Sequence, residues 1–315
     1  MLLEIREVSK KPPGWIKQGI KLGNTFHYRR KNPIVHNIFN LSVLCLILSW
    51  VGGLVYLGSI LTTWLYIPLG ALGFGLSYFM LIILVVHEAS HQMFIILKNS
   101  KRARVWNRLF GWLVCIPFGI NYSQHWEIGH LIHHSYPVEP QDPQNCPETI
   151  HTGATLWRYL TKVMLVPGYA LLRPGSTCPT AKPYSQDWTL TAGAAISIIT
   201  IGLLEIYCCH WTVAVAAILG IQILVALNIL KIAMEHGGDV GKRDYYFLRS
   251  CSSFFPFRKI FMPLNITLHF EHHLNCSVPW YDLLRYHNNL QEIVPDEFKS
   301  LLFKSNIAVW KQINQ

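Results

Sequence analysis

Three short histidine clusters contain the residues best suited to chemistry in this chain. They read His87-Glu-Ala-Ser-His91, His130-Leu-Ile-His133-His134 and His269-Phe-Glu-His272-His273. Neutral imidazole is the commonest protein ligand for a transition metal, and a histidine-rich set suits iron, zinc, copper or nickel better than calcium or magnesium. The sequence therefore predicts a metal site, which the fold must assemble from three separated segments.

The spacing inside each cluster predicts shared ligation. His87 and His91 are four residues apart, about one helical turn, so they lie on one face of a helix. The second and third clusters each place histidines in a 1-4-5 pattern, which lets two rings reach one ion and the third ring reach another. Eight such ligands exceed the four of a zinc site. Two metal ions are the more economical interpretation.

Three residues outside the clusters are further candidates. His236 follows the last apolar stretch and is a candidate ninth ligand, or else part of a helix C-cap beside the glycines that follow it. His125 would lie about 140° around a helix from His130, which favours a place beside the metal rather than on it. Asn265 would reach a metal through water, or would cap a helix. The lone histidines are expected to be structural or solvated: His27, His36, His151, His210 and His287.

Glu88 makes the first cluster an H-E-x-x-H sequence, the zinc metalloprotease motif in which glutamate is the general base. An intramembrane protease is therefore an alternative, but it needs only one further ligand and leaves both later clusters unexplained. We expect Glu88 instead to accept a hydrogen bond from the N–H of a ligand imidazole. The same role is predicted for five other acidic residues: Glu127, Glu271, Asp142, Asp239 and Asp282.

The composition indicates a membrane protein. The chain of 315 residues is 51% hydrophobic and only 14% charged, well below the roughly 25% charged residues of soluble domains. The net charge of +10 fits nucleic acid, a membrane surface or an acidic partner, but no zinc-finger, helix-turn-helix or aromatic RNA-binding signature supports nucleic acid. The eight cysteines form no C-x-x-C pair and are expected to be reduced thiols.

Four apolar stretches are long enough to cross a hydrocarbon core of about 30 Å. They form two tight pairs, so we predict an all-α integral membrane protein with four transmembrane helices in two hairpins. Interfacial helices are expected within 109–120 and 157–172, and a cap would carry the histidine clusters. The predicted spans are 38–62, 64–86, 188–208 and 211–230.

The charge distribution predicts the orientation of these spans. Neither the spans nor the short links near 62–64 and 208–211 contain Lys or Arg, so all 27 basic residues fall on one side. The positive-inside rule assigns that side to the cytoplasm. The three clusters, His236 and both chain ends are then cytoplasmic. The expected divisions are an N-terminal arm (1–37), a membrane domain (38–285) and a C-terminal tail (286–315).

The order of the clusters resembles the histidine boxes of the membrane fatty acid desaturase superfamily. H-x-x-x-H is followed by H-x-x-H-H and by a C-terminal H-x-x-H-H, and the supporting context includes Pro-Gln-Asp-Pro at 140–143 and Val-Pro-Trp-Tyr at 278–281. The resemblance covers about 80–285. It implies a non-haem centre of two iron ions that uses O₂ and two donor electrons to take hydrogen from an unactivated C–H bond. The implied ligands are His87, His91, His130, His133, His134, His236, His269, His272 and His273.

The resemblance also bears on the substrate and the electron donor. Fatty acyl desaturation is favoured, and carotenoid or other hydrocarbon hydroxylation or ketolation by the same superfamily is the alternative. A non-enzymatic role in metal binding or metal transport is a further alternative. The lipid would enter from the bilayer, since an apolar substrate gains nothing by crossing water. The chain has no His-Pro-Gly-Gly haem motif of a fused cytochrome b5, so a separate ferredoxin or cytochrome b5 is expected, attracted by the basic face.

Overall fold

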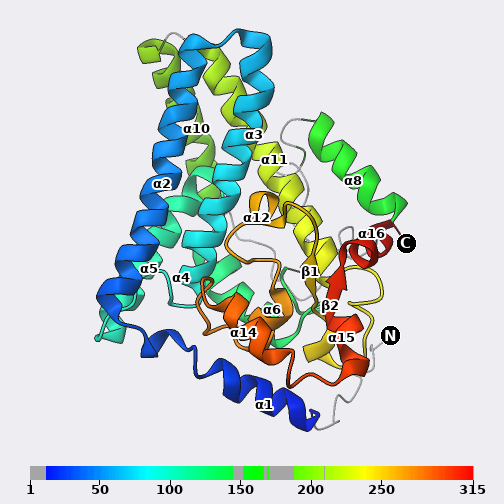
Figure 1. Cartoon of the computed structure of the whole chain (residues 1–315). Helices are drawn as coiled ribbons and strands as arrows, with labels where there is room; N and C mark the ends of the chain where they lie inside the picture. The colour runs from blue at the N-terminus through cyan, green and yellow to red at the C-terminus, as the bar shows by residue number, and fades with distance from the viewer. Residues whose placement is uncertain (1–11, 145–151, 167–168, 170–187, 209, 315) are drawn as a thin grey trace.

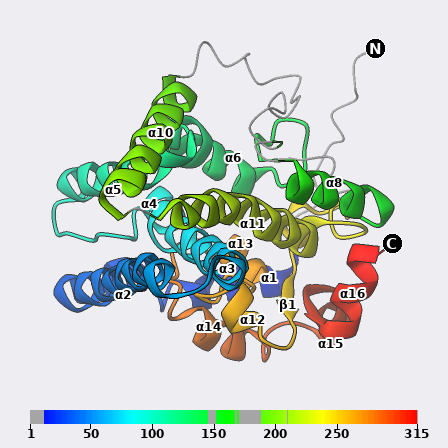
Figure 2. The same ribbon diagram turned by 90° about the horizontal axis from the view of Figure 1, so that it is seen from above.

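A computed structural model describes residues 12–144, 152–166, 169, 188–208 and 210–314 of this mainly helical chain (Figure 1). Long helices form a bundle in the upper part of Figure 1, and shorter elements gather below and beside it. Viewed from above, α11 lies between α3 and α10, and it packs against both (Figure 2). The bundle helices are α2 (Pro33–Ile60), α3 (Thr63–Leu81), α10 (Trp188–Cys208) and α11 (Trp211–His236).

Three helices are long and apolar enough to cross a membrane: Pro33–Ile60, Thr63–Ser90 and Trp211–His236. The second and third contain the predicted spans 64–86 and 211–230 and extend beyond them, and the first covers residues 38–60 of the predicted span 38–62. The first begins at Pro33 rather than at residue 38, because the Asn32 side chain accepts hydrogen bonds from the first backbone N–H groups and proline suits the first helical position. The third predicted span, 188–208, forms α10, whose apolar part Trp188–Leu204 is shorter. The four-span count and its orientation remain predictions.

The shorter elements surround the lower end of the bundle. The first part of the chain adds α1 (Gly14–Gly23) and a 3-10 turn at Tyr28–Arg30. The segment between the two helix pairs adds a π-helical turn at Ile82–His87, α4 (Glu88–Ser90), α5 (Ser100–Cys115), a 3-10 turn at Ile116–Phe118, a π-helical turn at Tyr122–Ile128, α6 (Gly129–Ser135) and α8 (Ala154–Leu165). The predicted interfacial segment 109–120 thus ends α5, and part of 157–172 lies in α8.

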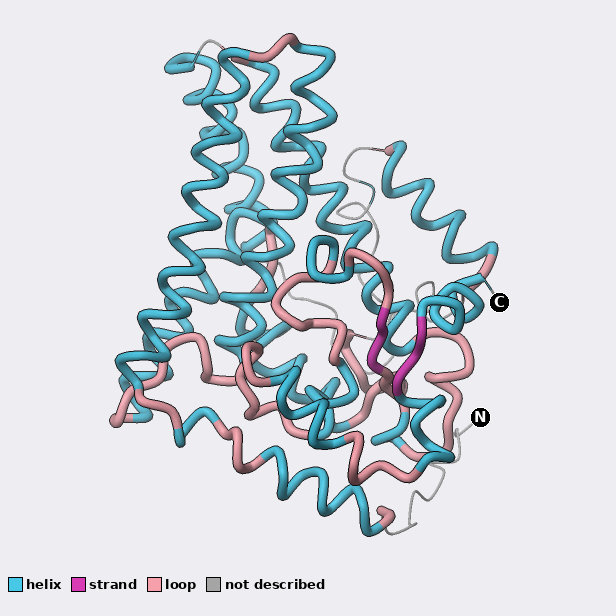
Figure 3. The backbone as a smooth tube through the Cα atoms, in the orientation of Figure 1, coloured by secondary structure: helices cyan, strands magenta, loops and turns pink. Residues whose placement is uncertain are grey.

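The C-terminal part contains the only strands in the described residues, a departure from the all-α prediction. Two strands of three residues form a parallel pair in which Ser253 lies opposite Lys304 (Figure 3). Pairing between segments fifty residues apart along the chain carries no local sequence signal. The elements are a 3-10 turn at Tyr246–Leu248, β1 (Ser252–Phe254), α12 (Arg258–Phe261), α13 (His269–Leu274), α14 (Leu283–Leu290), α15 (Asp296–Leu302), β2 (Phe303–Ser305) and α16 (Asn306–Asn314).

Helix α16 closes the lower end of α11. The Gln312 side chain is buried, and its Nε2 donates to the carbonyls of Ala233, Met234 and Gly237 at 2.9–3.1 Å. These carbonyls lie at the end of α11, where few backbone N–H donors follow, although the Gly237 N–H also donates to the Ala233 carbonyl at 3.0 Å. The last described helix of the chain therefore caps the helix that ends at His236.

Helices α3 and α11 approach closely through glycines. A Cβ on Gly220 would lie 2.7 Å from Phe74 Cβ and 3.0 Å from the backbone nitrogen of Gly75. A Cβ on Gly75 would lie 2.5 Å from Ile223 Cγ2. Small residues let two helix backbones come together in a membrane, where van der Waals packing drives their association.

We expect Gly220→Ala to separate α3 from α11 and to destabilise the protein by about 1–3 kcal/mol, the usual cost of overpacking. Thermal unfolding of the detergent-purified chain measures this. Gly53→Ala is the matched control, because a Cβ at Gly53 in α2 would meet no atom within 4 Å. Equal melting temperatures for the two variants would contradict the packing argument.

Candidate metal centre

The first cluster lies where α3 changes its helical form. The π-helical turn at Ile82–His87 leads into α4, and the chain leaves the helix just after His91, where Gln92 has a positive φ of 61°. Such π-helical turns widen the helix locally and are frequent at functional sites. The His87 and His91 rings still lie 5.1 Å apart between centroids. Both side chains are buried.

The other histidines reach the same region from three separate elements. His130, His133 and His134 lie on α6, His269, His272 and His273 on α13, and His236 ends α11. His87 Nε2 is 3.0 Å from His272 Nε2, and His236 Nε2 is 2.9 Å from His269 Nε2. The fold therefore brings all nine predicted ligands into one buried region.

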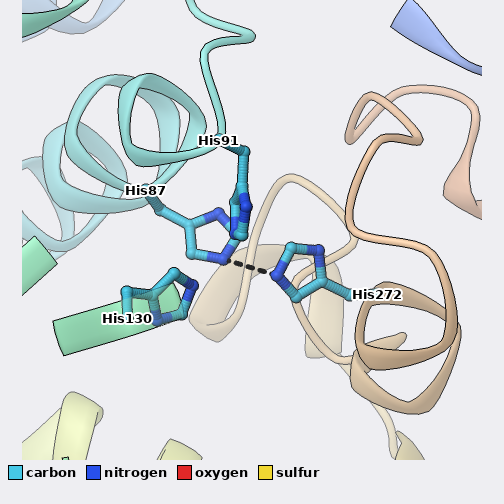
Figure 4. A group of neighbouring side chains, drawn as sticks. All are labelled: His87, His91, His130 and His272. Atoms are coloured by element: carbon cyan, nitrogen blue, oxygen red, sulfur yellow. Dashed lines mark hydrogen bonds between the residues drawn. The ribbon is translucent and has the colours of Figure 1, made fainter. Parts of the chain in front are cut away.

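The imidazoles form two groups of four, and within each group one ligand atom per residue lies within 4.8 Å of the others. We name the first group site A, which comprises His87, His91, His130 and His272. In Figure 4 the four rings of site A converge from three elements on a common centre. We name the second group site B, which comprises His133, His236, His269 and His273.

The sequence predicted that the second and third clusters each give two rings to one ion and one ring to the other. The structure differs from this in part. The third cluster follows it, with His272 in site A and the other two rings in site B. The second cluster gives one ring to each group, and His134 belongs to neither in the described residues. The His134 ring lies between them, 4.6 Å from the His272 ring and 4.3 Å from the His273 ring between centroids.

The nitrogen spacing fits ligation of a metal ion. A metal–imidazole bond of about 2.1 Å, as in zinc sites, places two ligand nitrogens at right angles about 3.0 Å apart. The closest Nε2 pairs are 3.0 Å apart in site A and 2.9 Å apart in site B. His91 Nε2 in site A and His273 Nε2 in site B are buried and have no hydrogen-bond partner among the described residues. Buried polar atoms normally have partners, so each group is suited to holding a cation.

Burial also sets the protonation state that ligation requires. It lowers the pKa of His91 to about 3 and the pKa of His130 and His272 well below the usual value, and neighbouring imidazoles lower all three further. In site B, burial first and then nearby cationic or histidine groups lower the pKa of His269 and His273. These rings are therefore neutral at pH 7, the form that binds a metal ion.

Hydrogen bonds to the remote ring nitrogens orient several rings. His133 Nδ1 lies 2.8 Å from Asp142 Oδ2, as predicted for that carboxylate. His236 Nδ1 lies 2.6 Å from the Arg249 carbonyl, which must accept its hydrogen and leaves Nε2 free to bind a metal. His130 Nδ1 lies 2.9 Å from Gln144 Oε1.

Asp142 remains a carboxylate in this setting. Burial would raise its pKa, but the His133 imidazole and the backbone N–H groups of Val138 and Gln144 lower it more. An ionised carboxylate is the stronger acceptor for an imidazole N–H. The Pro-Gln-Asp-Pro loop at 140–143 therefore serves to hold His133.

Glu235 is a carboxylate partner that the sequence reasoning missed. Its Oε1 lies 3.3 Å from His269 Nδ1, and its Oε2 accepts a hydrogen bond from Lys231 at 2.7 Å. The signal was available, because Lys231 and Glu235 stand four residues apart at the end of an otherwise uncharged stretch. That spacing places them on one helical face. Gln144 was also missed, and its neutral side chain gave no charge pattern to find it by.

Four of the predicted acidic partners do not contact the clusters' imidazoles, and those predictions were wrong. Glu127 pairs with Arg108, and Asp239 pairs with Lys242 near solvent. Asp282 pairs with Lys31 and Arg285, and Glu271 hydrogen-bonds to Ser252 and His287. Helix direction explains Glu271, because its side chain leaves α13 on the face opposite the metal-facing rings. Glu88 lies 3.5 Å from His87 Nδ1, near enough for attraction but long for a hydrogen bond.

The remaining candidates lie outside the two groups. The His125 ring stacks edge-on against Trp126, and its carbonyl accepts from Gln144. Asn265 donates to the Trp280 carbonyl at 3.0 Å. His36 and His287 are buried with hydrogen-bond partners of their own, as expected for structural residues. His27 and His210 also lie apart from the groups, and His151 lies outside the described residues.

Comparison with known proteins decides the family. The family model described as "Fatty acid desaturase" matches residues 62–303, a range that contains all nine histidines. The chain belongs to the fatty acid desaturase family. This desaturase is therefore a lipid-metabolising oxidoreductase and a membrane protein. The resemblance predicted from the boxes is confirmed.

Curated relatives of this desaturase are distant but extensive. The sphingolipid delta(4)-desaturase DES1 of Homo sapiens is 24% identical over 253 residues, which are 74% of this chain and 72% of the relative. The sn-1 acyl-lipid omega-3 desaturase (ferredoxin) of Nostoc sp. (strain 36) is 24% identical over 293 residues, 83% of this chain and 76% of the relative. No solved structure matches the chain.

We expect Asp142→Asn to weaken metal retention by about 10–100-fold, the usual effect of removing a carboxylate that orients a ligand imidazole. Titration with a chelator followed by elemental analysis measures this without an activity assay. Glu127→Gln is the matched control, since its carboxylate pairs with Arg108 and contacts neither group. Equal retention by the two variants would show that Asp142 does not orient a ligand.

Proposed function

We propose that this protein is an O₂-dependent desaturase that introduces a double bond into the acyl chain of a membrane lipid. The observation that carries the proposal is the pair of adjacent four-imidazole groups, buried at one end of apolar helices. One group would suit a single-metal enzyme, but two groups in contact suit a centre of two metal ions. Family membership makes iron the expected metal.

The nine histidines have distinct parts in this proposal. Four rings of site A and four rings of site B would each hold one iron, and His134 would complete the shell between them. Two irons held there would supply the oxidising power to take hydrogen from an unactivated C–H bond. Asp142, Glu235 and the Arg249 carbonyl would keep ring nitrogens aimed at the irons.

The protease alternative loses its support in this geometry. A catalytic zinc site has three protein ligands and an open position, whereas His87 and His91 share site A with two further imidazoles. Glu88 would also need access to a metal-bound water, but it lies against the remote nitrogen of His87. Glu88 thus lies beside an imidazole, 3.5 Å from its Nδ1, rather than at an open position of the site.

The proposed topology follows the basic residues. Four spans would place the histidine groups and both chain ends in the cytoplasm, where a soluble electron donor can approach. The name of the Nostoc relative includes ferredoxin, and a ferredoxin or cytochrome b5 is the proposed donor here. The lipid substrate would enter the centre from the bilayer side.

Purified wild-type protein should contain about two irons per chain, as two filled imidazole groups require. His272→Ala, which removes one ligand of site A, should retain markedly less iron by elemental analysis. His210→Ala is the control, because His210 precedes α11 at the end of the helix remote from His236. One zinc per chain, or unchanged iron in the His272 variant, would refute the proposed centre.

Expression in a host with a defined lipid content should yield acyl chains that lack two hydrogens, detected by mass spectrometry of the extracted lipids. His133→Ala should abolish the new product, since it removes a ligand of site B. An added oxygen atom in the product would instead identify a hydroxylase or ketolase of the same superfamily. Carotenoids in the same extract test the alternative substrate.

A further inference from the structure

A basic cavity lies beside the candidate centre, between the N-terminal arm and α5. It has a volume of about 550 Å³. Four cationic side chains line it: Arg29, Lys31, Lys98 and Arg104. Nothing in the proposed oxidation chemistry uses these residues. The cavity is therefore a candidate binding site for a separate ligand.

The charge of the cavity is largely uncompensated. Lys31 pairs with Asp282, but Arg29, Lys98 and Arg104 pair with no carboxylate in the part of the chain that the structure describes. Arg29 lies instead against the Tyr28 ring, 5.8 Å from its centroid. Three free cations around one cavity favour an anion with several oxygens, and phosphate is the commonest such group.

Two long helices add to this field. Pro33, the first residue of α2, and Ser100, the first residue of α5, both line the cavity. The positive ends of helices of 28 and 16 residues thus meet at the cavity wall. Helix N-termini favour bound anions, which strengthens the contribution of the side chains.

The cavity wall is fixed before any ligand arrives. The segment after the first histidine cluster is hydrogen-bonded to α2 by Asn37, which both donates to the Ile96 carbonyl and accepts from its N–H at 2.9 Å. Asn107 of α5 binds the backbone of Ile95 in the same two ways, at 2.7 and 3.1 Å. A preformed wall lowers the ordering cost of binding.

The surroundings of the cavity indicate a lipid as the source of the phosphate. The first turns of α2 expose Ile34, Val35 and Ile38, whose relative exposure is 60–70%. On the other side, α5 exposes Val105 and Leu113. In a membrane protein such faces contact lipid, so the cations lie where the apolar surface ends, at the level of the headgroups.

We propose that this cavity binds the phosphate headgroup of a bilayer phospholipid, with its acyl chains against the exposed faces of α2 and α5. The site is close to the centre, because Gln92 lines the cavity and directly follows His91. The proposal does not depend on the metal or on the reaction. It predicts that the protein distinguishes phospholipids from lipids that lack phosphate.

The test titrates the detergent-purified full chain with dioleoyl phosphatidylglycerol and with dioleoylglycerol, which has the same chains and no phosphate. The paired substitution Lys98→Gln and Arg104→Gln should weaken phosphatidylglycerol binding by about 30-fold, because it removes two cations that attract the headgroup. Lys101→Gln with Arg102→Gln is the matched control. It removes the same charge from the same segment, and neither residue lines the cavity.

A selective loss in the Lys98 and Arg104 variant would support the proposal. Equal losses in both paired variants would reduce the effect to general surface charge and overturn it, as would equal binding of the two lipids by the wild type. Glycerol phosphate that binds as tightly as the lipid would assign the cavity to a soluble phosphate ester instead. If the paired variant fails to fold, the single substitution Arg29→Gln, at an exposed residue, can be compared with the control for phosphatidylglycerol binding.

Discussion

The axial alignment of α3 and α11 is the constraint on which the candidate centre depends. Each helix leads directly to a histidine of a candidate metal group, His87 after α3 and His236 at the end of α11. A slip of one helix past the other by one turn, about 5.4 Å, would exceed the spacing within either four-imidazole group. The close contacts at Gly75 and Gly220 hold α3 and α11 together. They therefore help to fix the positions of His87 and His236 at the ends of these helices.

The cap supplies the remaining candidate ligands, and polar contacts join it to the bundle. Trp280 Nε1 donates to Asn40 Oδ1 at 3.1 Å, and the Tyr281 hydroxyl lies 2.6 Å from His36 Nδ1. These residues belong to the Val-Pro-Trp-Tyr segment that follows the third cluster. Residues 278–281 thus connect the segment after α13 to α2 through hydrogen bonds.

The sequence was sufficient where the signal is local or is carried by composition. Uncharged stretches predicted the long helices, and the density of histidines in three clusters predicted a metal site at which those clusters meet. It was insufficient where contacts join distant segments. The pairing of β1 with β2, the contact of Glu235 with His269 and the outward position of Glu271 all depend on which face of an element the tertiary fold turns inward. The π-helical turn at Ile82–His87 likewise changes the direction in which the side chains after it point, compared with a regular α-helix.

The hydrogen bonds from Gln312 to the end of α11 give the C-terminal part of the chain a mechanical connection to the centre. Gln312 binds the carbonyls of Ala233 and Gly237 on either side of His236, so these hydrogen bonds would transmit a force on α16 to a candidate ligand ring. Any bulky fusion joined directly after α16 would act on that connection. Affinity tags and reporter proteins are therefore better placed at the N-terminal arm, or behind a long flexible linker.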